Sequence, residues 1–257
     1  MSWQAGHMCG RFAAGNHADL LMEYYRVQRD ATAGQVVLPN FNTAPTQNLL
    51  VVAESAEPDH SRELRVMKWG LVPSWASDPS IGNRMINARS ETAMSKPSFR
   101  HAFARHRCLI PVDGFYEWQA AERSDAPAMR GTTGRPIKQP YYIYPTDGSS
   151  LPVSGLFDVW HDPSGANPLV TCTILTTQAV GAMTTIHDRI PVVIEPSNWD
   201  AWLDPGVTDK QVASSLMQPA SVIPLEAVRV SREVNAVSHH GAELIAPLDP
   251  SELPISL

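Results

Sequence analysis

The sequence has few cysteines, no long apolar run and no excess of basic residues. Three cysteines in 257 residues give no disulfide framework and indicate a reducing compartment. No segment approaches the roughly 18 consecutive apolar residues that a membrane helix needs, and no apolar stretch at the N-terminus predicts a signal peptide. The formal net charge of -6 excludes nucleic-acid binding through overall positive charge. We therefore expect a cytoplasmic protein that does not contact a membrane.

The 22 prolines favour short strands and turns over long helices. Apolar residues with helical spacing predict a helix over 18–27. Further short helices are predicted over 197–203 and 209–217. Apolar or alternating runs predict strands at 48–53, 63–69, 108–112, 115–118, 141–144, 152–156 and 170–176. Because these elements follow no regular βαβ period, they predict a single-domain α+β fold around a curved, mostly antiparallel, barrel-like sheet.

The ends and the loops suggest how the domain is bounded. Residues 1–7 are polar and a second methionine follows at position 8, so we expect a leader or a mis-assigned start there. The main domain is predicted to span 8–250, with 251–257 as a C-terminal tail. Residues 119–137 are rich in Ala, Gly, Thr and Pro and predict a mobile loop between paired strands. The turn signal Asp113-Gly114 predicts a hairpin or bulge that leads into 115–118.

Four segments concentrate residues with chemical potential. They are Met8-Cys9-Gly10-Arg11-Phe12, then Trp69 to Trp75 together with Asn87 to Thr92, then Asp113 to Trp118, and Ile186 to Pro191. In this order and spacing they resemble the SRAP family, named for SOS-response-associated peptidases, whose members crosslink to abasic sites in single-stranded DNA. The resemblance runs from Met8 to about Pro247 and includes Ala44-Pro45-Thr46 and Val234-Asn235.

This resemblance implies four site residues. The family's N-terminal cysteine, exposed by removal of the initiator methionine, matches Cys9. Its asparagine before Ala-Arg matches Asn87, its glutamate before tryptophan matches Glu117, and its histidine before Asp-Arg matches His187. The resemblance also implies abasic single-stranded DNA as the partner. We expect a monomer that needs neither a metal nor an organic cofactor.

The chemistry of a terminal cysteine agrees with that reading. If Met8 is the start, its removal leaves Cys9 with a free α-amine, whose usual pKa is about 7.7–8.0. A neutral amine condenses with the open-chain aldehyde of an abasic sugar to a Schiff base, and the Cys9 thiol then closes a thiazolidine on the same carbon. Glu117 is the expected proton shuttle, His187 the expected acid toward the sugar ring oxygen or the 3′ phosphate, and Asn87 a hydrogen-bonding positioner. A retained leader makes the Cys9 nitrogen an amide, which cannot form the Schiff base.

DNA contacts are expected from a local basic patch. Between Arg84 and Arg107 there are six Lys or Arg residues and one acid, Glu91, which suits a phosphate track. The residues predicted to contact DNA are Arg11, Trp69, Trp75, Arg84, Arg89 and Arg189, the arginines through phosphates and the tryptophans by stacking on bases.

Other interpretations of the same residues remain open at this point. The protein is alternatively a thiol autopeptidase that processes its own N-terminus, or a non-catalytic module that binds single-stranded DNA. Cys108 and Cys172 lie in apolar, strand-like runs and are predicted to be buried core thiols. The adjacent pair His239-His240 is not expected to bind a metal, because neighbouring side chains on a strand point to opposite faces.

Overall fold

The computed structural model describes residues 9–55, 57, 60–120, 137–165 and 168–257. The predicted leader at 1–7 lies outside these residues, as does most of the predicted 119–137 loop. The prediction that this loop joins two paired strands is confirmed, because the strands on either side of it pair antiparallel. No helix among the described residues is long and apolar enough to cross a membrane.

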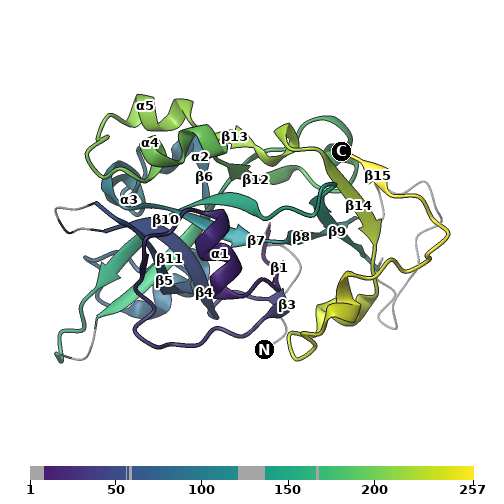
Figure 1. The fold of residues 1–257 in the computed structure, drawn as a ribbon, viewed down its shortest axis with the longest axis horizontal. Coiled ribbons are helices and arrows are strands. Elements are labelled where there is room, and N and C mark those ends of the chain that lie inside the picture. Colours follow the sequence, from purple (N-terminus) through teal and green to yellow (C-terminus); the bar gives the residue numbers. More distant parts are fainter. Residues whose placement is uncertain (1–8, 56, 58–59, 121–136, 166–167) are drawn as a thin grey trace.

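The strands form two sheets (Figure 1). The smaller sheet has the order β15 (Ile255–Ser256), β14 (Leu225–Arg229), β9 (Gln139–Pro145), β8 (Gly114–Gln119), β1 (Phe12–Ala14) and β3 (Asn40–Thr43). The larger has the order β13 (Gln218–Pro219), β12 (Arg189–Val193), β10 (Leu151–Trp160), β7 (Arg107–Val112), β4 (Asn48–Glu54), β5 (Arg62–Trp69), β11 (Leu169–Gln178) and β6 (Asn87–Arg89), with β2 (Arg29–Asp30) beside β5. Most pairings are antiparallel, so the predicted α+β class is confirmed.

The larger sheet closes on itself. Strands β10, β7, β4, β5 and β11 pair in sequence, and β11 pairs back to β10, which makes the expected barrel-like core. Side chains alternate along its strands as the two-residue period requires. On β4, Val51 points into one buried cluster with Trp69 and Cys108, while its neighbour Val52 packs in a second cluster with Phe103. Both predicted core thiols, Cys108 and Cys172, are buried.

Short helices cover the outside of the barrel. The α-helices are α1 (Ala18–Tyr24), α2 (Ser90–Ala93), α3 (Arg100–Arg105), α4 (Trp199–Leu203) and α5 (Lys210–Ser215). The 3₁₀ turns are η1 (Pro79–Arg84), η3 (Gly181–Thr185), η4 (Pro196–Asn198), η5 (Ala220–Val222), η6 (Arg232–Asn235) and η7 (Ala242–Ile245). Figure 1 shows α3, α4 and α5 at one end of the molecule, remote from β14 and β15. Helix α1 is shorter than predicted, because Arg26 has a positive φ of 53° and interrupts the helical spacing.

Of the hairpin or bulge predicted at Asp113-Gly114, the hairpin is wrong. Strand β7 before this turn belongs to the larger sheet, whereas β8 after it pairs with β1 and β9 in the smaller one. The chain therefore crosses between sheets at Asp113. The Asp113 carboxylate accepts the N–H of Gly15 at 2.5 Å, which ties the crossover to the segment after β1. A local turn signal cannot distinguish a hairpin from such a crossover, because the partner strand is chosen by contacts distant in sequence.

Arg107 does not belong to the exposed basic patch that the sequence predicted between Arg84 and Arg107, because it is only 1% exposed. Its guanidinium donates to the carbonyls of Phe103 (3.0 Å), Ala104 (2.9 Å), Trp202 (2.6 Å) and Asp204 (2.6 Å). These carbonyls lie at the C-terminal ends of α3 and α4, where backbone acceptors lack helical partners and carry partial negative charge. Arg107 therefore holds two helices against the barrel and does not face a phosphate.

We expect Arg107→Met to lower the free energy of unfolding by about 2–4 kcal/mol, because buried carbonyls lose a charged donor. Arg105→Met is the matched control. Arg105 is exposed in the same helix-to-strand segment, so its loss is expected within about 0.5 kcal/mol. Urea unfolding measures both, and equal losses in the two variants would contradict this role for Arg107.

Candidate active site

Cys9 and Glu117 meet because β1 and β8 pair antiparallel. Phe12 lies opposite Phe115, and the Tyr116 N–H donates to the Arg11 carbonyl at 3.0 Å. This register brings the chain before β1 alongside the end of β8. The backbone N–H of Cys9 donates to Glu117 Oε1 at 2.7 Å, and both residues are buried. A carboxylate thus contacts the very nitrogen that becomes an α-amine when Cys9 is the first residue.

His187 approaches Glu117 from the other sheet. It lies between η3 and β12, and its Nε2 is 3.9 Å from Glu117 Oε2. Its Nδ1 accepts the backbone N–H of Arg189 at 3.1 Å. Since Nδ1 is an acceptor, the neutral ring carries its proton on Nε2, the nitrogen that faces Glu117. Gln119 also joins the two regions, because its Nε2 donates to the Thr185 carbonyl at 3.0 Å.

Burial controls the protonation of this cluster. It raises the pKa of Glu117 above its ordinary value, although His187 and the hydrogen bonds from Cys9 oppose the rise. Burial also raises the pKa of the Cys9 thiol well above its ordinary range, with the charge of Glu117 adding to the effect and Arg189 opposing it. The thiol therefore stays protonated at neutral pH, and a Glu117 that holds a proton more readily lies closer in pKa to an α-amine.

Arg189 is held by Glu91 rather than left free. Its guanidinium donates to Glu91 Oε1 and Oε2 at 2.6 and 2.9 Å, the bidentate geometry typical of strong arginine–carboxylate pairs, and to the Thr176 carbonyl at 2.5 Å. A phosphate at Arg189 would therefore have to displace the Glu91 carboxylate. The sequence interpretation missed Glu91 as a partner, although it lies in the segment that contains Asn87.

Asn87 lies in β6, opposite Ile174 of β11. The preceding carbonyl, that of Ile86, accepts the indole N–H of Trp69 at 2.8 Å, and the Trp69 ring lies 4.7 Å from that of Phe12 in β1. This series of contacts connects the strand of Asn87 to the strand that follows Cys9. The positioning role of Asn87 stays a prediction.

Two of the predicted DNA contacts are wrong. Trp69 is 0% exposed and donates its indole N–H internally, so it has no face for a base. Arg11 is 8% exposed and donates to Asn42 Oδ1 and the Val234 carbonyl, both at 2.7 Å. Single-residue arguments could not reveal this, because Asn42 and Val234 are far from Arg11 in sequence. By contrast Trp75 is 61% exposed, and Arg84 and Arg89 are exposed.

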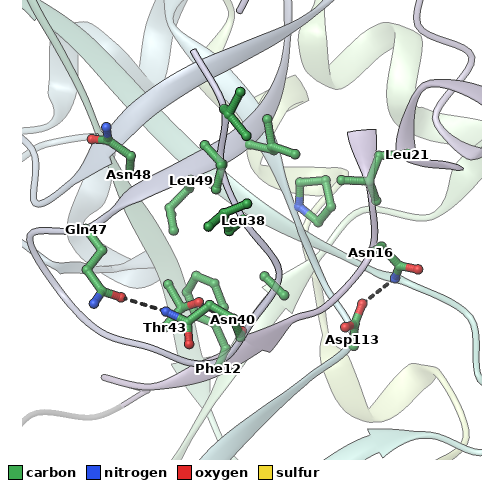
Figure 2. Close-up of a pocket in the computed structure, with 15 residues that line it drawn as sticks. Phe12, Asn16, Leu21, Leu38, Asn40, Thr43, Gln47, Asn48, Leu49 and Asp113 are labelled. Atoms are coloured by element: carbon green, nitrogen blue, oxygen red, sulfur yellow. Dashed lines mark hydrogen bonds between the residues drawn. The ribbon is translucent and has the colours of Figure 1, made fainter. Parts of the chain in front are cut away.

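A separate cavity of about 290 Å³ lies beside β1, and Phe12 and Ala14 of this strand line it (Figure 2). Its lining mixes apolar side chains with amides, and Figure 2 shows the Asn16–Asp113 hydrogen bond at its rim. Phe12 contributes to its wall, but among the described residues Cys9, Glu117 and His187 do not line it. His101, His106 and Asp158, which have the spacing of metal ligands, lie outside both the cavity and the Cys9 cluster.

A family profile described as SOS response associated peptidase (SRAP) matches residues 8–237. This chain belongs to the SRAP family. An abasic site processing protein YoqW of Bacillus subtilis is 38% identical over 238 residues, which cover 93% of this chain and 99% of that protein. The abasic site processing protein HMCES of Pongo abelii is 32% identical over 249 residues, 82% of this chain and 66% of that protein. A crystal structure of a Bacteroides thetaiotaomicron protein shares the fold, with a TM-score of 0.74 and 21% identity, covering 93% of this chain and 99% of that one.

The SRAP chain is expected to lose stability as Glu117 ionises. A raised folded-state pKa means that the group stabilises the fold below its ordinary pKa, and that this contribution is lost as pH rises through the raised value. Glu117→Gln mimics the protonated acid and still accepts the Cys9 N–H. We therefore expect Glu117→Gln to be more stable than the wild type at pH 8, with the difference closing below about pH 4.

Denaturant unfolding from pH 4 to pH 8 measures this difference. Glu23→Gln is the control, because Glu23 is exposed on α1 and its substitution is expected to change stability equally at every pH. A wild type that is more stable than Glu117→Gln at pH 8 would show that Cys9 and His187 more than compensate for the burial of the charge.

Proposed function

We propose that this SRAP protein processes abasic sites in single-stranded DNA and forms a covalent thiazolidine with them through Cys9. The observation that carries the proposal is the 2.7 Å contact between the Cys9 nitrogen and the buried Glu117 carboxylate, with His187 facing the same carboxylate. The relatives named abasic site processing proteins support this substrate, since YoqW and HMCES are 38% and 32% identical to the chain over alignments that cover 93% and 82% of it.

Each step of the proposed reaction is assigned to a group in the cluster of Cys9, Glu117 and His187. Ring opening of the sugar needs a proton on the ring oxygen, and the Nε2 proton of His187 faces the cluster where that oxygen would lie. The neutral Cys9 amine attacks C1′ of the aldehyde and forms a carbinolamine, which loses one water to give an iminium. Glu117 accepts the amine proton and returns one to the departing hydroxyl. A carboxylate at 2.7 Å also stabilises the positive charge of the iminium.

The thiol acts second. Its raised pKa keeps it protonated and weakly nucleophilic at neutral pH, so it does not compete with the amine for the aldehyde. Once the iminium forms, the sulfur adds to C1′, its proton passes to Glu117, and the five-membered ring closes. The overall condensation joins amine, thiol and aldehyde and releases one water.

The DNA strand is proposed to reach the site past Arg89. Arg89 lies opposite Thr176 in β11, and the Thr176 carbonyl accepts from Arg189, two residues after His187. Arg89 is exposed and lies on the strand next to β11, so its cation suits a phosphate flanking the lesion. Arg84 and the ring of Trp75 extend the exposed surface for a single strand.

Self-processing is a second candidate, favoured by the backbone at Cys9. This residue has a positive φ of 44°, a conformation that costs a non-glycine residue on the order of 1 kcal/mol and is relieved if the preceding peptide bond is cut. In this reaction the Cys9 thiol attacks the carbonyl before it, Glu117 transfers the proton to the leaving nitrogen, and water hydrolyses the thioester. Mass spectrometry of purified full-length protein over time tests self-processing. A mass that stays that of the chain beginning at Met1 excludes this reaction.

We expect protein that begins at Cys9 to form an adduct with an abasic single-stranded oligonucleotide that survives a denaturing gel. Cys9→Ser and Cys9→Ala keep the α-amine but lack the thiol. They are expected to give no stable adduct, and to give one only when borohydride reduces the transient imine. A chain that keeps residues 1–7 is expected to be inert with and without reductant. A stable, unreduced adduct of Cys9→Ala would contradict the proposed ring.

We expect Trp75→Ala to weaken the binding of intact single-stranded DNA about tenfold, because base stacking on an aromatic ring contributes about 1–3 kcal/mol. Tyr24→Ala is the control, since Tyr24 is another exposed aromatic ring, on α1. Fluorescence anisotropy with a labelled oligonucleotide measures both. Equal affinities of Trp75→Ala and the wild type would remove Trp75 from the DNA path.

A further inference from the structure

Three potential metal ligands converge at the end of helix α3, outside the Cys9 cluster. His101 lies within α3, His106 is its C-terminal cap, and Asp158 lies in β10. The segments are neighbours because β7, which follows His106, pairs with β10, and the Phe157 N–H donates to the His106 carbonyl at 2.9 Å. One ligand atom from each of the three side chains lies within 4.8 Å of the other two.

Each imidazole packs against another ring. The His106 ring stacks on Phe157 with centroids 5.1 Å apart and an interplanar angle of 25°, and the His101 ring meets it edge-on at 5.1 Å and 83°. The His106 Nδ1 atom is buried and has no hydrogen-bond partner among the described residues. Its nearest carboxylate oxygen is Asp158 Oδ1 at 3.8 Å, too far for a direct hydrogen bond. A buried nitrogen without a partner is destabilising unless something occupies the gap.

Backbone hydrogen bonds orient the Asp158 carboxylate. Asp158 is buried, and its Oδ2 accepts the Ser74 N–H while its Oδ1 accepts the Val159 N–H, both at 2.9 Å. Each oxygen keeps a second lone pair. Such outer hydrogen bonds are typical of metal-ligating carboxylates, because they fix the direction of the oxygen toward the ion.

We propose that His101, His106 and Asp158 bind a divalent transition metal of the zinc class. Two imidazoles and one carboxylate suit zinc or cobalt rather than calcium or magnesium, which prefer oxygen ligands. Three protein ligands leave one tetrahedral position for water. Bond lengths of about 2.0–2.2 Å place tetrahedral ligand atoms roughly 3.4 Å apart, so the 3.8 Å between His106 and Asp158 has to shorten only slightly. His101 is exposed and free to rotate toward the ion.

A bound ion would join three segments of the chain. It would connect the C-terminal end of α3 to β10 and, through the Ser74 N–H on Asp158, to the turn that carries Trp75. The expected consequence is a more stable fold in the presence of the metal. This proposal does not depend on the DNA chemistry of Cys9, so its test is independent of adduct formation.

The test titrates chelator-treated full-length protein with Zn²⁺ and, separately, with Co²⁺. We expect about one bound equivalent, visible absorption bands of tetrahedral Co²⁺, and a thermal midpoint that rises by about 5–10 °C at a hundredfold excess of metal over Kd. His101→Ala is expected to keep the metal-free midpoint of the wild type, because this side chain is exposed, and to lose the metal-dependent rise and the cobalt bands.

His240→Ala is the matched control, since His240 is exposed and belongs to the adjacent pair His239-His240. It is expected to bind metal as the wild type does. Asp158→Asn is a second variant that still offers an oxygen to the Ser74 N–H, and it is expected to lose metal binding as well. Either of two results overturns the proposal: a wild-type midpoint that metal does not move, or His101→Ala and wild type that respond to metal equally.

Discussion

The hydrogen bond from the Cys9 nitrogen to the buried Glu117 carboxylate is the interaction around which this protein is organised. It exists only because β1 is inserted between β8 and β3, which places the start of the domain in the middle of a sheet rather than at its edge. N-terminal segments are usually among the least ordered parts of a domain unless a strand or helix holds them. Here strand β1, which begins at Phe12, pairs with a strand on each side, so the fold positions the proposed nucleophile Cys9.

Burying Glu117 disfavours its charged form, and the rest of the cluster reduces that penalty only in part. His187 lies 3.9 Å away, at a longer distance than a direct hydrogen bond. The same burial keeps the Cys9 thiol protonated. The site destabilises both the Cys9 thiolate and the Glu117 carboxylate, so it does not favour a resting thiolate. In the proposed reaction, a carboxylate that binds protons readily suits an amine that must lose a proton. The same carboxylate supplies the counter-charge for a cationic iminium. The proposed order, amine first and sulfur second, rests on this electrostatic environment.

The two sheets contribute different residues to the site. The closed barrel with its helices buries most of the large apolar side chains and orients His187 and Arg189 through β11 and β12. The smaller sheet carries Cys9 and Glu117. The crossover at Asp113 and the Gln119–Thr185 hydrogen bond join these two regions. The cluster of Cys9, Glu117 and His187 therefore lies where the sheets meet, and its geometry depends on their relative placement.

The sequence by itself determined the α+β class, most strand positions and the family, because hydrophobic alternation and the spacing of short motifs are local properties of the chain. It also identified Cys9, Glu117 and His187 as one group. Only the tertiary structure decided which arginines and tryptophans are available to a ligand. Arg11, Trp69 and Arg107 resemble surface contacts in sequence, yet partners distant along the chain bury them and use their donors. The same long-range pairing made β7 and β8 members of different sheets, since a turn signal fixes where a chain bends but not which strand it meets afterwards.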